Sequence, residues 1–332
     1  MKIIIPMAGM GTRMRPHTLT VPKPLIPVAG KPIVHRLVED ITRVCNEKVD
    51  EIAFIIHPAF GKAVEEMLVS MAEKLGAKGS IYYQKTALGT AHAVHCAKES
   101  LKGNVIVAFA DTLFIADFKL DTNQDAIIWV QKVEDPSAFG VVKLNEKGMI
   151  TDFVEKPKDY VSDLAIIGIY YFKDGENLAN ELQYLIDNDI NVKGEYQLTT
   201  ALENMKNKNV KFYPGQVDEW LDCGNKNATV ITNQRVLANY GSAISKNITV
   251  TNSTIIEPCV ILDGAVITNS VVGPYVSVGL NTKIEKSVVE NSIIQNNTII
   301  DCKVIANSMI GSNCSVEGCQ SDLSIGDYIQ LA

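Results

Sequence analysis

Residues 8–24 read A-G-M-G-T-R-M-R-P-H-T-L-T-V-P-K-P, directly after the apolar run K-I-I-I-P-M at residues 2–7. A buried strand that opens into a glycine loop is a way to bring backbone N–H groups against phosphates. Gly9 and Gly11 can take positive φ values and let a phosphate approach the main chain, which a Cβ would block. The segment therefore predicts a phosphate-binding loop after the first strand of the fold.

The same segment carries two cationic side chains. Arg13 offers a planar fork of hydrogen-bond donors, and Lys23 offers a compact charge. It is not a P-loop, because no Gly-Lys-Ser/Thr follows, and Met14 stands where a dinucleotide fingerprint has its third glycine. The longer string, G-x-G-T-R continued by K-P-L-I-P at 23–27, resembles the signature of the sugar-1-phosphate nucleotidylyltransferases. These enzymes join an NTP to a sugar 1-phosphate and release pyrophosphate. The resemblance implies that the nucleotide is bound by Ala8, Gly9, Gly11, Thr12 and Arg13.

The composition is that of a globular protein with room for two domains. The chain has 332 residues, 46% of them hydrophobic and 21% charged. A net charge of −7 argues against nucleic acid as the main partner. No apolar run approaches membrane-spanning length and no signal-peptide pattern is present, so we expect a cytoplasmic protein without a membrane partner. The cysteines form no C-x-x-C pair and predict buried thiols in a reducing compartment; they are residues 45, 96, 223, 259, 302, 314 and 319.

Strands and helices alternate over residues 1–240, which predicts an α/β domain, and the resemblance implies that this domain binds the NTP and the sugar phosphate. We expect a Rossmann-like nucleotidyltransferase domain with a mixed, largely parallel sheet, whose ligands gather at the carboxyl ends of the strands. The expected strands are 3–7, 51–56, 104–110 and 126–132, and the expected helices are 32–45, 63–75, 196–206 and 227–239.

After residue 245 the sequence changes to short β-branched pairs among Asn, Ser, Gly and Thr. Apolar residues recur every six positions with two phase slips of four, and Asn-Ser pairs mark the same repeat at 252, 269, 291 and 307. A six-residue period fits neither a helix nor a sandwich strand, but it fits a β-helix. These hexapeptide repeats resemble the left-handed β-helix and predict such a domain over 245–320. The expected inward residues are Ile248, Thr254, Val260, Val266, Val272, Val278, Ile284, Val288, Ile294, Ile300, Val304, Ile310 and Val316.

The predicted β-helix contains no histidine, since all five histidines lie in the N-terminal half of the chain. Many left-handed β-helix proteins are acyltransferases that use a histidine as general base. A second, acyl-transferring site is therefore not expected here. We interpret the coil as an oligomerisation or packing element, or at most a regulatory one, and expect a homo-oligomer.

Two aspartates stand at positions that suit a metal ion. Asp111 ends the buried strand N-V-I-V-A-F-A, and Asp222 lies in E-W-L-D-C-G. Mg²⁺ prefers hard oxygen ligands and usually takes one or two carboxylates, with phosphate and water completing its shell. In the resembling family the acids of F-A-D and W-L-D-x-G hold the catalytic magnesium. The resemblance therefore implies Mg²⁺ on Asp111 and Asp222.

The segment Y-Q-K-T-A-L-G-T-A at 83–91 is expected to read the base. The Gln84 amide offers a donor and an acceptor side by side, which matches the edge of uracil or thymine. Gly89 opens a helix, and its bare backbone can lie against the base, with Thr90 beside it. In the family, a glutamine five residues before this glycine marks uridine or thymidine users. The resemblance therefore implies UTP or dTTP as the nucleotide.

Two further motifs, F-G-V-V at 139–142 and V-E-K-P at 154–157, resemble the family's sugar-binding segments. A glutamate there can accept hydrogen bonds from sugar hydroxyls, while the lysine neutralises the incoming phosphate. Ile166 stands where the N-acetylglucosamine enzymes carry an asparagine, which favours glucose 1-phosphate over N-acetylglucosamine 1-phosphate. The resemblance assigns the sugar phosphate to Gly140, Glu155, Lys156, Gly168 and Glu195.

The expected mechanism is an in-line attack of the sugar phosphate on the α-phosphorus, with catalysis by positioning and charge neutralisation. Arg13 would hold the leaving phosphates, Lys23 would stabilise charge near the α-phosphate, and Lys156 would orient the nucleophile. Alternatives with the same chemistry are a mannose-1-phosphate guanylyltransferase, against which Gln84 speaks, and an N-acetylmuramic or N-acetylglucosamine 1-phosphate uridylyltransferase. A non-enzyme alternative is a regulatory scaffold such as certain translation-initiation exchange-factor subunits. An eroded loop or a missing metal acid would favour the scaffold, and neither is found.

Overall fold

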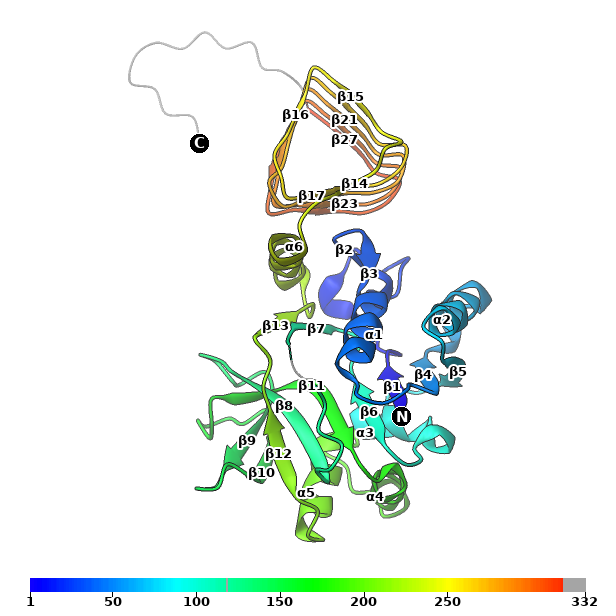
Figure 1. Ribbon diagram of the computed structural model, residues 1–332, viewed down its shortest axis with the longest axis vertical. Helices are drawn as coiled ribbons and strands as arrows, with labels where there is room; N and C mark the ends of the chain where they lie inside the picture. The colour runs from blue at the N-terminus through cyan, green and yellow to red at the C-terminus, as the bar shows by residue number, and fades with distance from the viewer. Residues whose placement is uncertain (118, 319–332) are drawn as a thin grey trace. The chain divides into compact units, whose positions relative to one another are not determined.

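The structure is a computed structural model that describes residues 1–117 and 119–318 as two compact units (Figure 1). Unit 1 comprises Met1–Ile26 and Pro32–Asn225, and unit 2 comprises Pro27–Lys31 and the described residues from Lys226 onward. The second segment of unit 2 thus begins at Lys226, whereas the sequence suggested a domain boundary near residue 240. Cys319 and the last two residues of the predicted β-helix, 319–320, lie outside the described residues.

Unit 1 is built on a nine-stranded mixed sheet. Its strands are β1 (Lys2–Pro6), β4 (Glu51–Ile56), β5 (Lys78–Tyr83), β6 (Val105–Ala108), β8 (Ala126–Lys132), β9 (Gly140–Leu144), β10 (Ile150–Glu155), β11 (Leu164–Phe172) and β12 (Phe212–Gly215). β6, β1, β4 and β5 run parallel in that spatial order, and β12 runs parallel to β8. β11 is antiparallel to β6, β8 and β9, and β9 is antiparallel to β10.

Five helices of unit 1 flank this sheet (Figure 1): α1 (Ile33–Val44), α2 (Lys62–Lys74), α3 (Thr90–His95), α4 (Gly175–Asp187) and α5 (Leu198–Asn207). α3, α4 and α5 share one apolar cluster with strand residues such as Ile4, Ile55 and Ile128. α2 packs on β4 and β5, where a Cβ on Gly79 would lie 2.7 Å from the Cα of Val69. No helix among the described residues has the length and apolar character needed to cross a membrane.

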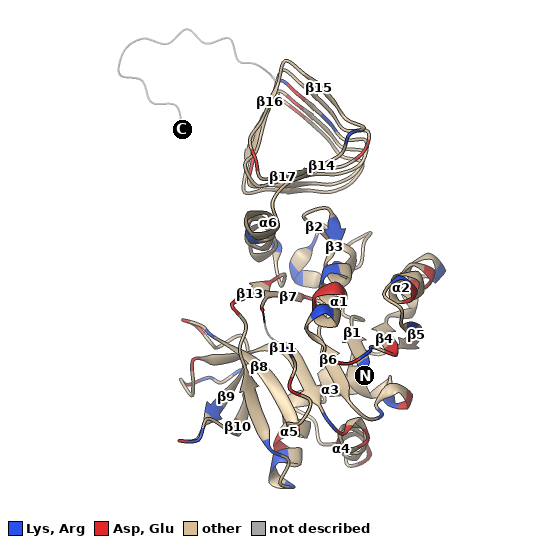
Figure 2. Ribbon diagram, in the orientation of Figure 1, with Lys and Arg blue, Asp and Glu red and all other residues tan. Residues whose placement is uncertain are grey.

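The parallel strands β1, β4 and β6 are largely buried, which explains why they read as apolar runs, whereas the parallel strand β5 at the sheet edge is only partly buried. In β1, Ile3, Ile4 and Ile5 are all fully buried, and in β4 the five residues after Glu51 are buried. Figure 2 shows that β8 and β11 also have long stretches without charged residues. All the predicted strands and helices of this unit are present, with ends shifted by at most two residues. The chain therefore leaves β1 at the carboxyl edge of this sheet, between β4 and β6.

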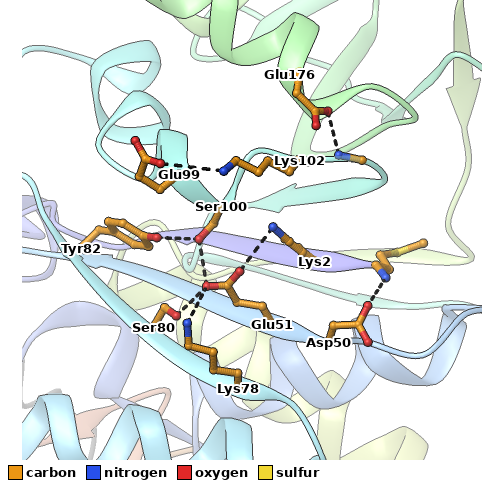
Figure 3. Close-up of polar contacts among 12 residues, drawn as sticks. Lys2, Asp50, Glu51, Lys78, Ser80, Tyr82, Glu99, Ser100, Lys102 and Glu176 are labelled. Carbon is orange, nitrogen blue, oxygen red and sulfur yellow. Dashed lines mark hydrogen bonds and ion pairs between the residues drawn. The ribbon is translucent and has the colours of Figure 1, made fainter.

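A polar cluster joins the first residues of the parallel strands (Figure 3). Glu51 accepts hydrogen bonds from the hydroxyls of Ser80 (2.6 Å) and Ser100 (3.0 Å), and the ammonium of Lys2 lies 3.6 Å from its carboxylate. Burial raises the pKa of Glu51, but the two hydroxyl bonds and the charges of Lys2 and Lys78 outweigh burial and hold that pKa below its ordinary value. The carboxylate therefore links three strands of the sheet in its ionised form.

Unit 2 contains three parallel sheets that form the sides of a triangular coil, a left-handed β-helix (Figure 1). The first side holds β14 (Ala243–Ile244), β17 (Cys259–Ile261), β20 (Val276–Val278), β23 (Ile293–Ile294) and β26 (Met309–Ile310). The second holds β15 (Thr249–Thr251), β18 (Val266–Thr268), β21 (Lys283–Glu285), β24 (Ile299–Asp301) and β27 (Ser315–Glu317). The third holds β16 (Thr254–Ile255), β19 (Val271–Val272), β22 (Val288–Glu290) and β25 (Val304–Ala306).

The inward residues of the coil differ in part from the expected set. Val288 and Val304 are 41% and 84% exposed, whereas Val289 and Ile305 belong to the interior cluster. Val266 pairs with Lys283 and Lys283 with Ile299, so one coil takes 17 residues and the next 16. Where one side of a coil has five residues instead of six, the next inward residue follows after five positions. At Ile284 and Ile300 the prediction from the sequence used a step of four instead. For the same reason Ile255, Ile261 and Ile267 point inward instead of Thr254, Val260 and Val266.

The predicted Asn-Ser markers are turns of the coil. Asn252, Asn269, Asn291 and Asn307 all have positive φ values, between 37° and 52°. Asparagine tolerates this left-handed conformation better than other residues with a Cβ. The amides also stack along the coil, since Asn252 donates to Asn269 at 2.7 Å and Asn291 donates to Asn307 at 2.6 Å. The repeat therefore marks the corners of the β-helix.

Unit 2 also contains the strand β2 (Pro27–Val28) and the helix α6 (Lys226–Tyr240), and the strand β3 (Lys31–Pro32) begins at its residue Lys31. Asn233 of α6 is fully buried, and its Oδ1 accepts hydrogen bonds from the N–H of Ala29 (2.8 Å) and the hydroxyl of Ser277 (2.7 Å). Its Nδ2 donates to the carbonyl of Tyr275 at 3.2 Å. One amide thus ties the β2–β3 turn and the helix to the coil.

Candidate active site

Gly11 shapes the loop that follows β1. It has φ 60° and ψ 36° and precedes the short 3₁₀ helix η1 (Thr12–Met14). A Cβ on Gly11 would lie 2.8 Å from the Cβ of Lys23, and the hydroxyl of Thr18 closes the loop by donating to the Gly11 carbonyl at 2.8 Å. At Gly9 the expectation of a positive φ is wrong, and a Cβ there would meet nothing within 4 Å. Only Gly11 is therefore required by the loop conformation itself.

The two cations of the loop have different surroundings. Arg13 is exposed, and its guanidinium makes no hydrogen bond or ion pair with the part of the chain that the structure describes. Lys23 begins the 3₁₀ helix η2 (Lys23–Leu25) and is only 7% exposed. Its ammonium lies 2.7 Å from Oδ2 of Asp111, which supplies the partner that a buried charge needs. Arg13 is thus available to a ligand, whereas Lys23 is held by an acid of the same site.

Asp111 and Asp222 are brought together by a two-stranded ribbon. β7 (Thr112–Ile115) pairs antiparallel with β13 (Glu219–Asp222), and the N–H of Cys223 donates to the Asp111 carbonyl at 2.9 Å. Burial raises the pKa of Asp222, and the charge of Asp111 raises it further, against the opposing effects of the Gly224 N–H, Lys23 and Arg13. The two carboxylates therefore repel one another across the site.

This pair of acids fits a divalent cation. No group of three or more His, Cys, Asp or Glu side chains able to hold a metal ion occurs within residues 1–117 and 119–318. Mg²⁺ does not need such a group, because it commonly binds one or two carboxylates together with phosphate oxygens and water. A cation between Asp111 and Asp222 would remove their mutual repulsion, so the residues present suit the ion.

Gln84 and Gly89 lie between β5 and α3. Gln84 is 7% exposed, and its Nε2 donates to the Gly89 carbonyl at 3.2 Å and lies 3.1 Å from Nδ1 of His92. Gly89 has φ 98°, and a Cβ there would lie 2.5 Å from the carbonyl oxygen of Tyr196. Only glycine fits such a close approach of two backbones. His92 was not anticipated, because its position in a short helix gave no sign that it meets Gln84.

Thr90 and Glu195 are joined by a residue that sequence reasoning missed. The Thr90 hydroxyl accepts from the N–H of Leu198 at 2.9 Å and donates to Gln197 Oε1 at 3.4 Å. Gln197, 9% exposed, donates in turn to Glu195 Oε2 at 3.0 Å. The available signal was the string G-E-Y-Q-L-T, from which only Glu195 was selected. These bonds hold the start of α3 against the start of α5.

Glu155 ends β10 beside Gly140, and Lys156 follows it. Glu155 Oε2 accepts from the hydroxyl of Thr199 at 3.2 Å, and a Cβ on Gly140 would lie 3.2 Å from the same oxygen. Lys156 has φ 42° and is fixed there by a 3.0 Å hydrogen bond from its N–H to the Phe139 carbonyl. A left-handed lysine is uncommon, and such backbone strain concentrates at functional sites. The arrangement presents a carboxylate and an ammonium 3.6 Å apart.

Gly168 supports the site from the sheet. It has φ 86° in β11, where the pairing with β8 shifts between Ile166 and Tyr170. Its carbonyl accepts from the N–H of Phe109 at 2.9 Å, so it fixes the segment that leads to Asp111. Ile166 itself is 7% exposed and belongs to the apolar cluster.

A cavity of about 470 Å³ in unit 1 collects most of these residues, within the size range of small-molecule sites. Three of the predicted residues, Gly140, Gly168 and Asp222, do not line it, although Gly224 next to Asp222 does. Gln197 and Phe109 line it without having been predicted. The predicted residues that line it are Ala8, Gly9, Gly11, Thr12, Arg13, Lys23, Gln84, Gly89, Thr90, Asp111, Glu155, Lys156 and Glu195.

Comparison with known sequences gives a family for this chain. A sequence model of the family described as nucleotidyl transferase matches residues 2–239. The glucose-1-phosphate thymidylyltransferase of Streptomyces antibioticus is 30% identical over 319 residues, which cover 89% of this chain and 87% of that protein. The bifunctional protein GlmU of Methanococcus vannielii is 31% identical over 269 residues, 77% of this chain. The match spans 61% of the length of that GlmU.

Solved structures share the fold. The nucleoside-diphosphate-sugar pyrophosphorylase from Vibrio cholerae RC9 aligns with a TM-score of 0.60 at 20% identity, covering 70% of this chain and 99% of its own. A UDP-glucose pyrophosphorylase complexed with UDP-glucose aligns with a TM-score of 0.58 at 24% identity, covering 72% of this chain and 98% of its own. At these identities the likeness concerns the architecture.

Proposed function

The chain belongs to the nucleotidyl transferase family, and we propose that it transfers a nucleotidyl group from UTP or dTTP to a sugar 1-phosphate, with glucose 1-phosphate favoured. The observation that carries the proposal is that a single cavity is lined by Arg13 and Lys23, by Gln84, and by Glu155 and Lys156. Two phosphate-bearing reactants require cations on both sides of one reaction centre. The name of the Streptomyces antibioticus relative fits this proposal.

In the proposed reaction an oxygen of the sugar phosphate attacks the α-phosphorus of the NTP in line. A new P–O bond joins the sugar phosphate to the nucleotidyl group, and the bond from the α-phosphorus to the bridging oxygen breaks. Its electron pair leaves with pyrophosphate. Arg13 and the backbone of residues 9–12 would hold the β- and γ-phosphates, while Lys156 would orient the nucleophile. No general base is required, because a phosphate monoester is already anionic at neutral pH.

Lys23, Asp111 and Asp222 would together compensate the negative charge near the α-phosphate. The two acids would hold Mg²⁺, which would neutralise negative charge on the reacting phosphates. Lys23, now paired with Asp111 at 2.7 Å, would exchange that partner for an oxygen of the α-phosphate. Its confinement at 7% exposure pre-organises the ammonium for that contact.

For the rest of the molecule we propose that residues 1–240 carry the reaction and that the β-helix, predicted over 245–320, makes a homo-oligomer. Support comes from one column of its third side, where Val271, Val288 and Val304 pair in register. Val288 and Val304 expose much of their apolar surface, and exposed apolar patches mark association surfaces. We also propose a cytoplasmic location, since the six cysteines within the described residues are all free thiols.

A panel of UTP, dTTP, ATP and GTP against the 1-phosphates of glucose, N-acetylglucosamine, mannose and N-acetylmuramic acid tests this function. Pyrophosphate release is the readout. We expect release with UTP or dTTP, fastest with glucose 1-phosphate. A preference for ATP or GTP would contradict the assignment of the base to Gln84, and GTP with mannose 1-phosphate would select the guanylyltransferase instead. No release with any pair would contradict nucleotidyl transfer to these sugars.

A further inference from the structure

The amide of Gln84 is held by two acceptors at its nitrogen end. Nε2 lies 3.2 Å from the carbonyl oxygen of Gly89 and 3.1 Å from Nδ1 of His92. A primary amide nitrogen has two N–H groups, so each acceptor takes one. The side chain is 7% exposed and lines the cavity. Its conformation is therefore set by contacts within the protein.

The Gly89 carbonyl decides which end of the amide is which. A carbonyl oxygen can only accept, so the group 3.2 Å from it must be the amide nitrogen. Nδ1 of His92, which faces the same nitrogen, must then accept as well, and this requires a neutral ring with its proton on Nε2. Burial lowers the pKa of His92, and the neighbouring His95 adds to this effect, so the neutral ring is favoured.

The oxygen of the amide is left for a ligand. Gln84 Oε1 accepts no hydrogen bond from the part of the chain that the structure describes. An acceptor presented to the cavity pairs with the N3–H donor of uracil or thymine. It cannot pair with N3 of cytosine, which is itself an acceptor. The orientation of the amide thus favours bases with a donor at N3 and an acceptor at C4 over cytosine, in which these two roles are reversed.

We propose that His92 is a positioning residue for base selection, which holds the Gln84 amide with its oxygen toward the nucleotide. The inference rests on the proposed function, in which Gln84 reads the base. Without the His92 acceptor, one N–H of the amide loses its partner in a nearly closed position. Only the Gly89 carbonyl would then oppose rotation of the amide, and a rotated amide would exchange that bond for one donated to the ligand, so cytosine would be rejected less strongly. His92 itself does not line the cavity, so it acts through Gln84.

The test compares two variants that differ in the acceptor alone. His92→Asn places an amide oxygen where Nδ1 stood, whereas His92→Leu fills similar space without an acceptor. The measured quantity is the ratio of kcat/KM for UTP to that for CTP, with one sugar 1-phosphate. We expect His92→Leu to lower this ratio by about 3- to 10-fold, the value of one hydrogen bond, mainly through KM. We expect His92→Asn to keep the ratio within about 2-fold of the wild type.

The outcomes separate the inference from the function on which it rests. An unchanged ratio in His92→Leu, or an equal loss in His92→Asn, would overturn the role of His92 while leaving the transferase intact. A wild-type enzyme that uses CTP as well as UTP would instead overturn both the assignment of Gln84 and this inference. Should His92→Leu fail to fold, as judged by circular dichroism, His92→Ala gives the same comparison.

Discussion

At the residue scale, the site depends on the close approach of two backbone segments. Gly11 and Lys23 lie so near that a Cβ on the glycine would come 2.8 Å from the lysine Cβ. Lys23 in turn holds Asp111 at 2.7 Å. The sequence predicted that these three residues belong together, because motif order carries that information. It did not predict His92 or Gln197, whose roles depend on hydrogen bonds between segments that meet only in the folded chain.

Gly11→Ala should lower kcat by at least about 10-fold, because the added methyl group would shift Lys23 from the position in which we propose that it contacts the α-phosphate. Gly76→Ala is the matched control, since Gly76 has a similar φ of 77° and nothing lies within 4 Å of its Cβ position. Both variants should lose about 1 kcal/mol of stability from the left-handed backbone. Equal kcat values for the two variants would contradict the account of Lys23. Steady-state kinetics with denaturant unfolding provides both readouts.

At the scale of elements, the sequence predicted what is local. β4 (Glu51–Ile56) and β8 (Ala126–Lys132) have the predicted bounds, because an apolar run with polar ends defines a buried strand. The antiparallel strands β9, β10 and β11 entered only as motifs, since their pairing joins residues distant in the chain. In the β-helix the sequence predicted the repeat, but at several coils the predicted inward residue is one position before the observed one. A side shortened by one residue has no local signature among β-branched pairs.

Glu51→Gln should destabilise unit 1 by about 1–2 kcal/mol at pH 7, because a partly buried carboxylate that accepts from two hydroxyl groups loses its charge. The folded pKa of Glu51 lies below its ordinary value, so its contribution is present above the unfolded pKa of about 4.3. That contribution is lost as the pH falls through the lower folded pKa. The difference between wild type and variant should therefore shrink by pH 3, as measured by urea unfolding at the two pH values.

Glu99→Gln serves as the control for this prediction, and both carboxylates appear in Figure 3. Glu99 pairs with Lys102 at 3.9 Å, and its side chain is 69% exposed. Exposed pairs of this kind contribute little to stability. Should Glu51→Gln behave like Glu99→Gln at pH 7, the strand-linking role of Glu51 would be wrong.

At the scale of the whole molecule, the chain passes between the two compact units at positions close in sequence to proposed site residues. Pro27 begins the first segment of unit 2, shortly after Lys23, and Lys226 begins the second, shortly after Asp222. Within unit 2 the segment at Pro27 and the helix at Lys226 are tied to the coil through Asn233. Unit 2 is therefore joined to unit 1 by links that follow Lys23 and Asp222 by four residues each in the chain.

Replacing Val288 and Val304 together by lysine should convert the protein to a monomer near 36.3 kDa, because charge on the exposed apolar column would oppose association. Ile299→Lys is the control, since Ile299 is 42% exposed but lies on another side of the coil, in β24. Light scattering coupled to size-exclusion chromatography gives the mass. A monomeric wild type, or an oligomer that survives the double substitution, would contradict the proposed role of the third side.

The central claim is that the sugar phosphate attacks the α-phosphorus of the nucleotide. Two parallel reactions with glucose 1-phosphate test it, one with UTP labelled with ³²P at the α-position and one with UTP labelled at the γ-position. The account predicts that the α-label appears in the nucleotide sugar and the γ-label in pyrophosphate. Appearance of the γ-label in inorganic phosphate or on the sugar, with the α-label retained in UDP, would contradict it.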